Sequence, residues 1–191
     1  PAVKAIVNTG PNRLEWQDQP LPAPGPGQVR IRTTACGVCA TDLVMIAGWD
    51  RTSFPAIPGH EWAGVVEATG PGVDTAIRGR RCVAENVRAD GGEVGFEHPG
   101  GYGQYLVTDT ANLQFLPDDF PASTAALIEP LAVALRAFGK LKVGSTLTPT
   151  LRPRSGRALS PQGRGSGKEG VPIFGDGPIG LIMVMLLKRA G

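Results

Sequence analysis

Residues 59–73 read GHEWAGVVEATGPGV, and this stretch decides how the rest of the chain is interpreted. A histidine and a glutamate, His60 and Glu61, stand together after Gly59. Residues 62–69 follow as a segment rich in apolar and β-branched side chains, which predicts a strand. The stretch therefore combines two potential metal ligands with a predicted strand.

Further short strands are predicted on both sides of this stretch. The 27 glycines and 18 prolines of the 191 residues favour many strands joined by turns over a helical bundle. The segments with partial alternation are residues 3–9, 13–19, 28–34, 80–85, 101–108 and 112–116. The first 120 residues are therefore expected to form a mainly β domain, a barrel or a sandwich.

Helices are expected next, over residues 122–128 and 131–138, which are rich in Ala and Leu. Pro130 lies between them and predicts a break followed by a new helix start. The residue before a proline is pushed out of helical geometry, so Glu129 is expected at a junction from which it can point inward.

Composition and charge exclude several classes of protein. Hydrophobic residues make up 41% and charged residues 19% of the chain, as in ordinary globular proteins, and the net charge of +2 gives no argument for nucleic acid or a membrane surface. No apolar run reaches 18 residues, and PAVKAIVNTG at the N-terminus lacks the features of a secretory signal. Three cysteines are too few for a disulfide framework, so a reducing, cytoplasmic setting is expected.

A second stretch, CGVCATD at residues 36–42, supplies thiols to go with His60. Zinc binds thiolate, imidazole and carboxylate ligands, and a catalytic site keeps one position open. Cys39, His60 and a nearby carboxylate provide that set. The alternatives are a redox pair or zinc knuckle made by Cys36 and Cys39, and a plain core role for His60; a knuckle needs a second ligand pair, which the sequence lacks.

Together the two stretches resemble the zinc-dependent medium-chain dehydrogenase family, especially its polyol and threonine dehydrogenase branch. The resemblance covers nearly all of residues 3–144 and resumes at 171–191. It implies a GroES-like β-barrel catalytic domain over residues 1–144, a secondary alcohol or polyol as the small-molecule substrate, hydride transfer to NAD or NADP, and a homo-oligomer for full-length relatives. It also implies that Cys39, and not Cys36, is the zinc ligand.

Two carboxylates compete for the remaining ligand role. Glu61 is adjacent to His60, and Glu129 lies in IEPLAVAL, which resembles the family's Glu-Pro-Leu segment near the zinc. The resemblance allows Glu61 to bind directly and Glu129 to bind directly or through water. The alternatives are a surface glutamate for Glu61 and a helix N-terminal charge for Glu129.

Two residues after Cys39 are expected to support the metal centre. Asp42 is predicted to bond the non-ligating nitrogen of His60, with the N-cap of a short helix over residues 43–47 as the alternative. Thr41 is the candidate proton carrier. Many relatives have a histidine three residues later, where this chain has Val44, so water or cofactor hydroxyls must complete the relay.

The other cysteine and histidine are expected outside the centre. Cys82 is predicted to be a buried strand residue and His98 a loop residue. Many relatives hold a second, structural zinc in a four-cysteine lobe, but residues 83–101 contain no cysteine. The sequence therefore predicts one catalytic zinc and no structural zinc.

A glycine-rich turn near the end predicts the start of a Rossmann-type nucleotide-binding domain over residues 171–191. Gly175, Gly177, Pro178, Ile179 and Gly180 lie in GDGPIG, between an apolar strand and an apolar helix. Such glycines let the backbone approach a dinucleotide pyrophosphate at the helix N-terminus. The residue that selects NAD or NADP is expected about 20 residues beyond the motif.

Residues 145–170 have few apolar side chains and are expected to be an irregular linker or insertion. In the family, the nucleotide-binding strand follows the catalytic domain after only a few residues, and the domain continues well past the point reached at Gly191. Two alternatives to a dehydrogenase therefore stay open: a truncated, non-catalytic zinc-binding barrel, and a zinc-free quinone or enoyl reductase of the same superfamily. Cys39 and His60 argue against the second.

Overall fold

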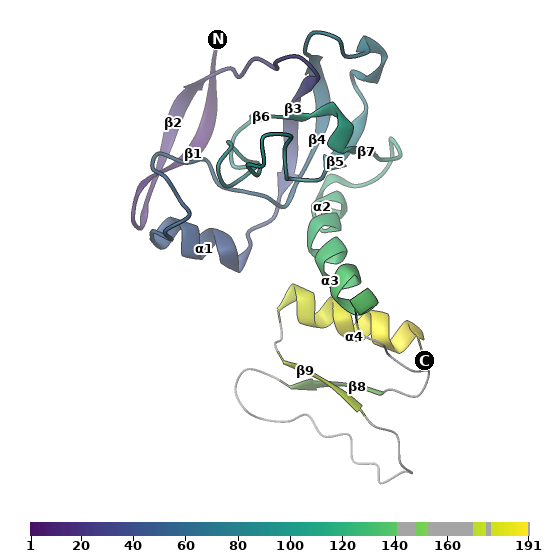
Figure 1. Cartoon of the computed structure of the whole chain (residues 1–191). Helices are drawn as coiled ribbons and strands as arrows, with labels where there is room; N and C mark the ends of the chain where they lie inside the picture. Colours follow the sequence, from purple (N-terminus) through teal and green to yellow (C-terminus); the bar gives the residue numbers. More distant parts are fainter. Residues whose placement is uncertain (141–147, 153–169, 175–176, 191) are drawn as a thin grey trace. The chain divides into compact units, whose positions relative to one another are not determined.

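The computed structural model describes residues 1–140, 148–152, 170–174 and 177–190 (Figure 1). It divides into two compact units, Pro1–Ile128 and Glu129–Gly191, and each is described by itself. The domain boundary expected at residue 144 lies outside the described residues and stays a prediction.

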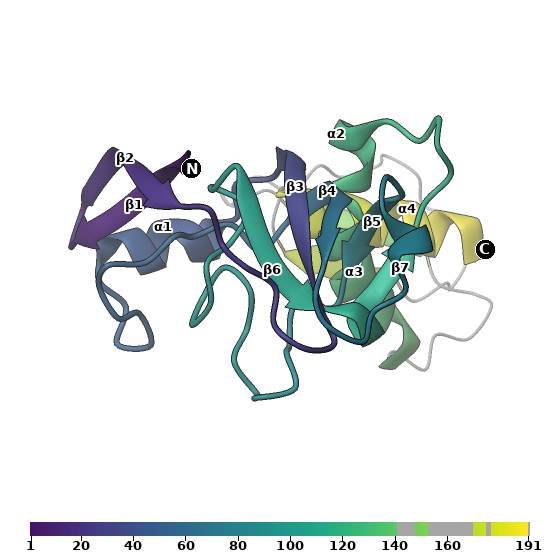
Figure 2. The ribbon, with the colours of Figure 1, turned by 90° about the horizontal axis from the view of Figure 1, so that it is seen from above.

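The first unit is built mainly from strands, as the sequence predicts. Five of them form an antiparallel sheet in the order β6-β3-β4-β5-β7, and Figure 2 shows them side by side from above. A separate antiparallel pair is formed by β1 and β2. The bounds are β1 Ala2–Gly10, β2 Arg13–Pro20, β3 Gln28–Cys36, β4 Trp62–Thr69, β5 Arg81–Ala84, β6 Tyr105–Asp109 and β7 Leu113–Phe115.

One strand is shorter than expected. The segment predicted from residue 101 enters the sheet only at Tyr105, because residues 100–103 form a turn in which the Gly103 N–H donates to the Gly100 carbonyl. The β1–β2 pair joins the rest of the unit through isolated bridges between Ala5 and Gly103 and between Asn8 and Ala56.

The first unit has two core clusters, a larger one that includes Val29 and Ile31 of β3 and a smaller one of Ala63, Val83 and Ala125. Alternation along β3 buries Val29 and Ile31, while Arg30 between them lies on the other face and is half-buried. Cys82 on β5 is fully buried in the larger cluster, which confirms its predicted role as a strand residue of the core. The buried members of the larger cluster are Val29, Ile31, Trp62, Val66, Cys82, Val94, Leu106 and Leu113.

Short helices connect the strands. The helix α1, Ala40–Ala47, ends at Gly48, whose positive φ of 104° is the left-handed conformation that glycine adopts without strain. Two 3₁₀ turns, η1 Thr75–Ile77 and η2 Thr110–Asn112, precede β5 and β7.

The helical region after β7 differs in detail from the prediction. The helices are α2, Ala122–Ala125, and α3, Ile128–Lys140, so the break falls at residues 126–127 and not at Pro130. Pro130 lies in the first turn of α3, where backbone N–H groups have no intrahelical acceptor and proline is tolerated. Glu129 therefore belongs to the first turn of α3.

Residues 122–140 together are long and apolar enough, by length and composition alone, to cross a membrane. Core helices of globular proteins meet the same criterion, so the segment carries no argument for a membrane.

The second unit contains a parallel strand pair covered by a helix. β8, Thr148–Arg152, pairs with β9, Gly170–Phe174, and α4, Pro178–Ala190, contacts both strands. Val184 and Leu187 on α4 pack with Phe138 of α3. The strand β8 lies within the segment expected to be an irregular linker; apart from β8 and Gly170, that segment lies outside the described residues.

Candidate metal centre

Three potential metal ligands come together in the first unit. One ligand atom from each of Cys39, His60 and Glu61 lies within 4.8 Å of the other two. Cys39 directly precedes α1, and the other two residues directly precede β4. The pairing of β3 with β4 therefore brings together Cys39 and His60, which are 21 positions apart in the sequence.

Cys39 is held in place as the N-cap of α1. Its backbone N–H donates to Asp42 Oδ2 at 2.8 Å, and its sulfur accepts from the Thr41 N–H at 3.5 Å. The alternative in which Asp42 is the N-cap is wrong, because Asp42 occupies the third helical position and closes a capping box with Cys39. The Thr41 hydroxyl lies 3.6 Å from the same sulfur.

Asp42 connects the segments around the centre. Its side chain is 0% exposed, and it contacts His60 Nδ1 at 3.2 Å and accepts from the Tyr102 hydroxyl at 3.0 Å. Burial raises the pKa of Asp42, but the bonds from His60 and from the Cys39 N–H outweigh it and hold this pKa below its usual value. The contact expected between Asp42 and His60 is therefore present.

His60 is buried and fixed at several points. Burial lowers its pKa, but the hydrogen bond and charge of Asp42, together with Cys39, raise that pKa to about 9 in the metal-free protein. The His60 carbonyl accepts from Asn86 Nδ2 at 2.8 Å. Because Nδ1 contacts Asp42, Nε2 is the nitrogen left for a metal.

Glu61 is placed in the cluster by a close backbone approach. The Gly37 N–H donates to the Glu61 carbonyl at 2.8 Å, and a Cβ atom at residue 37 would overlap the Glu61 carboxylate. Burial raises the pKa of Glu61, and the neighbouring His60 and Cys39 oppose this shift. The glycine at position 37 thus leaves the space that Glu61 occupies.

Glu129 lies in the second compact unit, in the first turn of α3. An acidic side chain there is favoured by the helix dipole, which matches the alternative considered for it. Its role as a ligand stays a prediction.

The remaining cysteine and histidine candidates lie outside the cluster. Cys36 ends β3, and burial with the nearby charges of Asp42 and Glu61 raises its thiol pKa to about 12. All three cysteines are free, so Cys36 and Cys39 form no disulfide. His98 is a loop residue, as predicted, with Nε2 3.0 Å from Asp90 Oδ1.

Three residues that support the centre were not found from the sequence. Tyr102 donates to Asp42 across 60 residues of sequence, Asn86 donates to the His60 carbonyl across 26, and the Phe96 ring lies 4.9 Å from the His60 ring. Each contact joins segments far apart in the chain, so no local spacing marks it.

In the second unit, part of the glycine-rich turn is described. Pro178, Ile179 and Gly180 form the first turn of α4, and the Leu181 N–H donates to the Gly177 carbonyl at 3.1 Å. Gly175 and Asp176 lie outside the described residues. The turn therefore leads into a helix N-terminus, as the motif predicts.

Known proteins share this fold. Residues 25–118 match the alcohol dehydrogenase GroES-like domain, which defines the class of the first unit. The chain is similar to dehydrogenases of the zinc-dependent medium-chain family.

Among its relatives, an L-threonine 3-dehydrogenase of Anaeromyxobacter is 31% identical over 99% of this chain and 53% of the relative. An (R,R)-butanediol dehydrogenase of Bacillus subtilis is 30% identical over 94% of this chain and 52% of the relative. A solved structure of the Escherichia coli protein RspB, complexed with NADH, has a TM-score of 0.79 and 26% identity over 98% of this chain and 53% of that one. The chain spans about half the length of the curated relatives it matches.

Proposed function

We propose that this chain provides the zinc-binding part of an NAD- or NADP-dependent dehydrogenase that oxidises a secondary alcohol or polyol. The observation that carries the proposal is the convergence of Cys39, His60 and Glu61 within 4.8 Å. Relatives named as threonine, butanediol and sorbitol dehydrogenases support the reaction type.

The donor set fits a catalytic zinc. A thiolate, an imidazole and a carboxylate are zinc ligands, and three protein ligands leave a position open for substrate. Within the part of the chain that the structure describes, this is the one such group of three. A single catalytic zinc without a structural zinc stays a prediction. Glu129 is a further candidate ligand, direct or through water.

A zinc ion bound there would act as a Lewis acid and lower the pKa of an alcohol hydroxyl. The chain itself supplies the groups around that hydroxyl. Asp42 holds the His60 ring through Nδ1, and Thr41 Oγ1, which lies beside the Cys39 sulfur, is the proposed carrier of the hydroxyl proton. Val44 carries no titratable group, so the proton continues to solvent through water or cofactor hydroxyls.

The hydride is expected to pass to a nicotinamide cofactor. Gly177, Pro178, Ile179 and Gly180 at the start of α4, with Gly175 before them, are the candidate contacts for its pyrophosphate, because N–H groups at a helix N-terminus bind anions. The RspB structure with NADH and a dehydrogenase structure with NADP support a cofactor of this class.

Zinc content of the purified chain and of two cysteine variants tests the metal centre. Cys39→Ser is expected to lose zinc, because the cluster loses its thiolate ligand. Cys36→Ser is the matched control and is expected to keep one zinc, since this thiol lies outside the group. Equal loss of zinc in both variants would show instead that the two cysteines bind metal as a pair.

A further inference from the structure

The His60 ring rests against an aromatic side chain that no part of the proposed chemistry uses. The Phe96 ring lies 4.9 Å from the His60 ring, centroid to centroid, with an interplanar angle of 34°. The Trp49 ring contacts Phe96 edge-on at 6.5 Å. Phe96 therefore covers the imidazole of a proposed metal ligand.

Phe96 is in turn covered by a cation. The guanidinium carbon of Arg51 lies 4.5 Å from the Phe96 ring centroid, within the range of a cation–π interaction. His60, Phe96 and Arg51 thus form a continuous stack from the proposed metal ligand outward.

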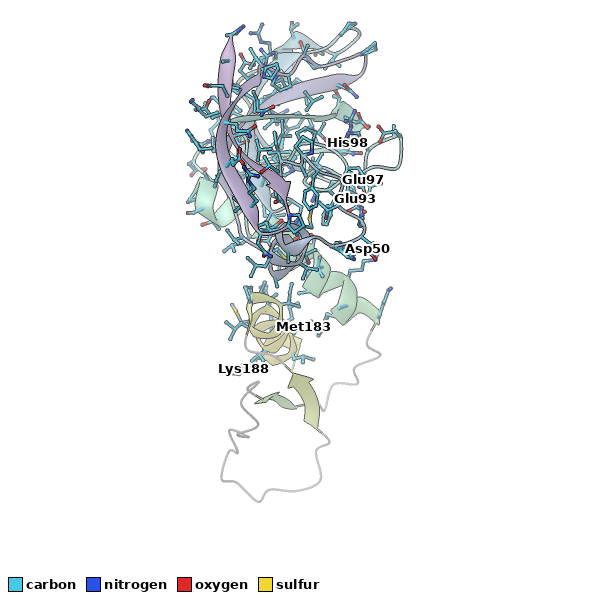
Figure 3. All side chains as sticks on the ribbon, turned by 90° about the vertical axis from the view of Figure 1, so that its left-hand side faces the viewer. Asp50, Glu93, Glu97, His98, Met183 and Lys188 are labelled. Carbon is cyan, nitrogen blue, oxygen red and sulfur yellow. The ribbon has the colours of Figure 1, made fainter. Side chains whose placement is uncertain are left out.

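Carboxylates on the loop that carries Phe96 hold Arg51 in this position. Arg51 Nε donates to Glu97 Oε1 at 2.6 Å and its terminal nitrogen donates to Glu97 Oε2 at 2.9 Å, a bidentate pair, while Glu93 Oε1 lies 3.1 Å away. Figure 3 shows Glu93 and Glu97 close together on one side of the first unit. Hydrogen bonding to Arg51 lowers the pKa of Glu97 to about 2 despite an opposing effect of burial.

The same loop also fixes the backbone next to His60. The Gly101 N–H donates to the Gly59 carbonyl at 2.7 Å. Gly95, at a φ of +89°, packs against the backbone of His60 so closely that a Cβ atom at residue 95 would lie 2.8 Å from the His60 backbone nitrogen. The loop therefore supports both the peptide and the ring of His60.

A cavity next to this stack gives Phe96 somewhere to move. It has a volume of about 290 Å³, and Arg51, Phe96 and Glu97 line it together with Ser53 and Ile57. A Phe96 side chain that lost its cation could turn toward this space, and the His60 ring would then lose the surface that limits its tilt.

We propose that Arg51 is a positioning residue for the metal centre: its ion pairs with Glu97 and Glu93 press Phe96 against His60 and so orient the metal-binding nitrogen. The inference rests on the proposed zinc site. Asp42 bonds the ring at Nδ1, and the Cys39 side chain, itself a proposed zinc ligand, also bonds the ring. Both contacts lie at the ring edge and do not by themselves stop the ring from tilting. Packing on the ring face removes this freedom, and such outer supports of metal ligands affect affinity strongly.

The test compares zinc release by the unchanged chain and by Arg51 variants, with a chromophoric chelator in excess. Arg51→Met is expected to speed release roughly tenfold, at the low end of the range for outer supports of metal ligands. Arg51→Lys keeps the positive charge but cannot form the bidentate pair with Glu97. Its rate of zinc release is therefore expected to lie between that of the unchanged chain and that of Arg51→Met. Phe96→Leu is expected to match Arg51→Met, and the double variant to be no faster than either single variant.

Arg30→Met is the matched control. Arg30 also pairs with a carboxylate, Glu67, at 2.6 Å, and also lies over an aromatic ring, Tyr105, at 5.9 Å, but it belongs to β3 and touches none of the proposed ligands. Its loss is expected to lower the thermal unfolding midpoint without changing zinc release from the folded protein.

The absorption spectrum of the cobalt-substituted chain is a second measurement, and it does not depend on the overall stability of the fold. Arg51→Met and Phe96→Leu are expected to shift the cobalt d–d bands, and Arg30→Met is expected to leave them unchanged. If Arg51→Met does not fold, Glu97→Gln takes its place, because it weakens the same pair without removing the cation.

Three results would overturn the inference. If zinc release and the cobalt spectrum are unchanged in both Arg51→Met and Phe96→Leu, the positioning role of Arg51 is refuted, while the proposed zinc site is not. Equal acceleration by Arg30→Met would reduce the effect to general destabilisation. An unchanged chain that binds no zinc would remove the proposed centre itself, and the inference with it.

Discussion

Replacing Asp42 by alanine is expected to destabilise the metal-free first unit more than any other single carboxylate change. Asp42 is fully buried and bonds the Cys39 N–H at 2.8 Å, the Tyr102 hydroxyl at 3.0 Å and His60 Nδ1 at 3.2 Å. A hydrogen bond to a charged group contributes about 1.5–3 kcal/mol, but such bonds are not additive when water can replace part of them. We therefore expect Asp42→Ala to lower the free energy of unfolding by about 3–5 kcal/mol.

Urea unfolding of the chelator-treated chain, followed by tryptophan fluorescence, measures this change. Trp62 follows His60 and Glu61 at the start of β4 and is buried, so its emission reports on this region. Asp18→Ala is the control: Asp18 pairs with Lys4 at 2.8 Å but is 61% exposed, and its loss is expected to change stability by less than about 0.5 kcal/mol. A loss below about 1 kcal/mol for Asp42→Ala would refute the reasoning.

The effect also has a definite dependence on pH. The pKa of Asp42 is lowered in the folded state, so its ionised form stabilises the fold above the ordinary aspartate pKa of about 3.9. This stabilisation is lost as the pH falls through the lower, folded-state pKa. The difference between the parent and Asp42→Asn is therefore expected at neutral pH and is expected to shrink in acid.

Three further predictions concern the ligands, the ion pair and turnover. Glu61→Gln is expected to weaken zinc binding roughly tenfold or more, measured by competition with a chelator, and more than Glu129→Gln does; the reverse order would assign the direct ligand to Glu129. Carboxyl NMR titration is expected to give Glu97 a pKa of about 2, which returns toward the ordinary value in Arg51→Met; an unchanged pKa would show that Arg51 is not its partner in solution. The 191-residue chain alone is expected to reduce NAD and NADP little or not at all with polyols and secondary alcohols, because one glycine turn cannot position a nicotinamide; robust zinc-dependent turnover would contradict this.

Local patterns in the sequence were sufficient for most strands of the first unit. The strand predicted over residues 3–9 is observed as β1, Ala2–Gly10, and the one over 62–69 has the bounds of β4. Alternation and flanking turns mark such strands because one face is buried. The start of β6 was missed because the glycines of residues 100–103 are used for close packing in a turn, which an alternation pattern does not reveal.

The helix break was predicted in kind but misplaced. Pro130 was interpreted as the break, whereas the chain breaks at residues 126–127 and accepts the proline inside the first turn of α3. Proline lacks a backbone N–H, and it is tolerated both at a break between helices and in the first turn of a helix. The sequence alone therefore does not choose between the two positions. The strand β8 was missed because its segment has few apolar residues and its pairing partner, β9, is distant in sequence.

In the candidate metal centre, too, residues within one short stretch could be predicted, whereas residues brought together by tertiary packing could not. Cys39, Thr41 and Asp42 share one short stretch and His60 and Glu61 another, so their spacing could be recognised. The residues that hold them, among them Asn86, Phe96 and Tyr102, come from a loop whose path is set by tertiary packing. Their side chains form no pattern with a fixed spacing, and only the folded loop shows what they touch.

The boundary between the two compact units has a practical consequence for dissecting this chain. It falls between Ile128 and Glu129, so a gene cut there keeps Cys39, His60 and Glu61 on one polypeptide and moves Glu129 to the other. The zinc affinity of the first piece can then be measured as increasing amounts of the piece with Glu129 are added, which tests whether Glu129 is a second carboxylate ligand. A zinc affinity that rises as the helical piece is added means that Glu129 reaches the metal, and an affinity set by the first piece alone means that the metal belongs to one module that can be moved into other scaffolds.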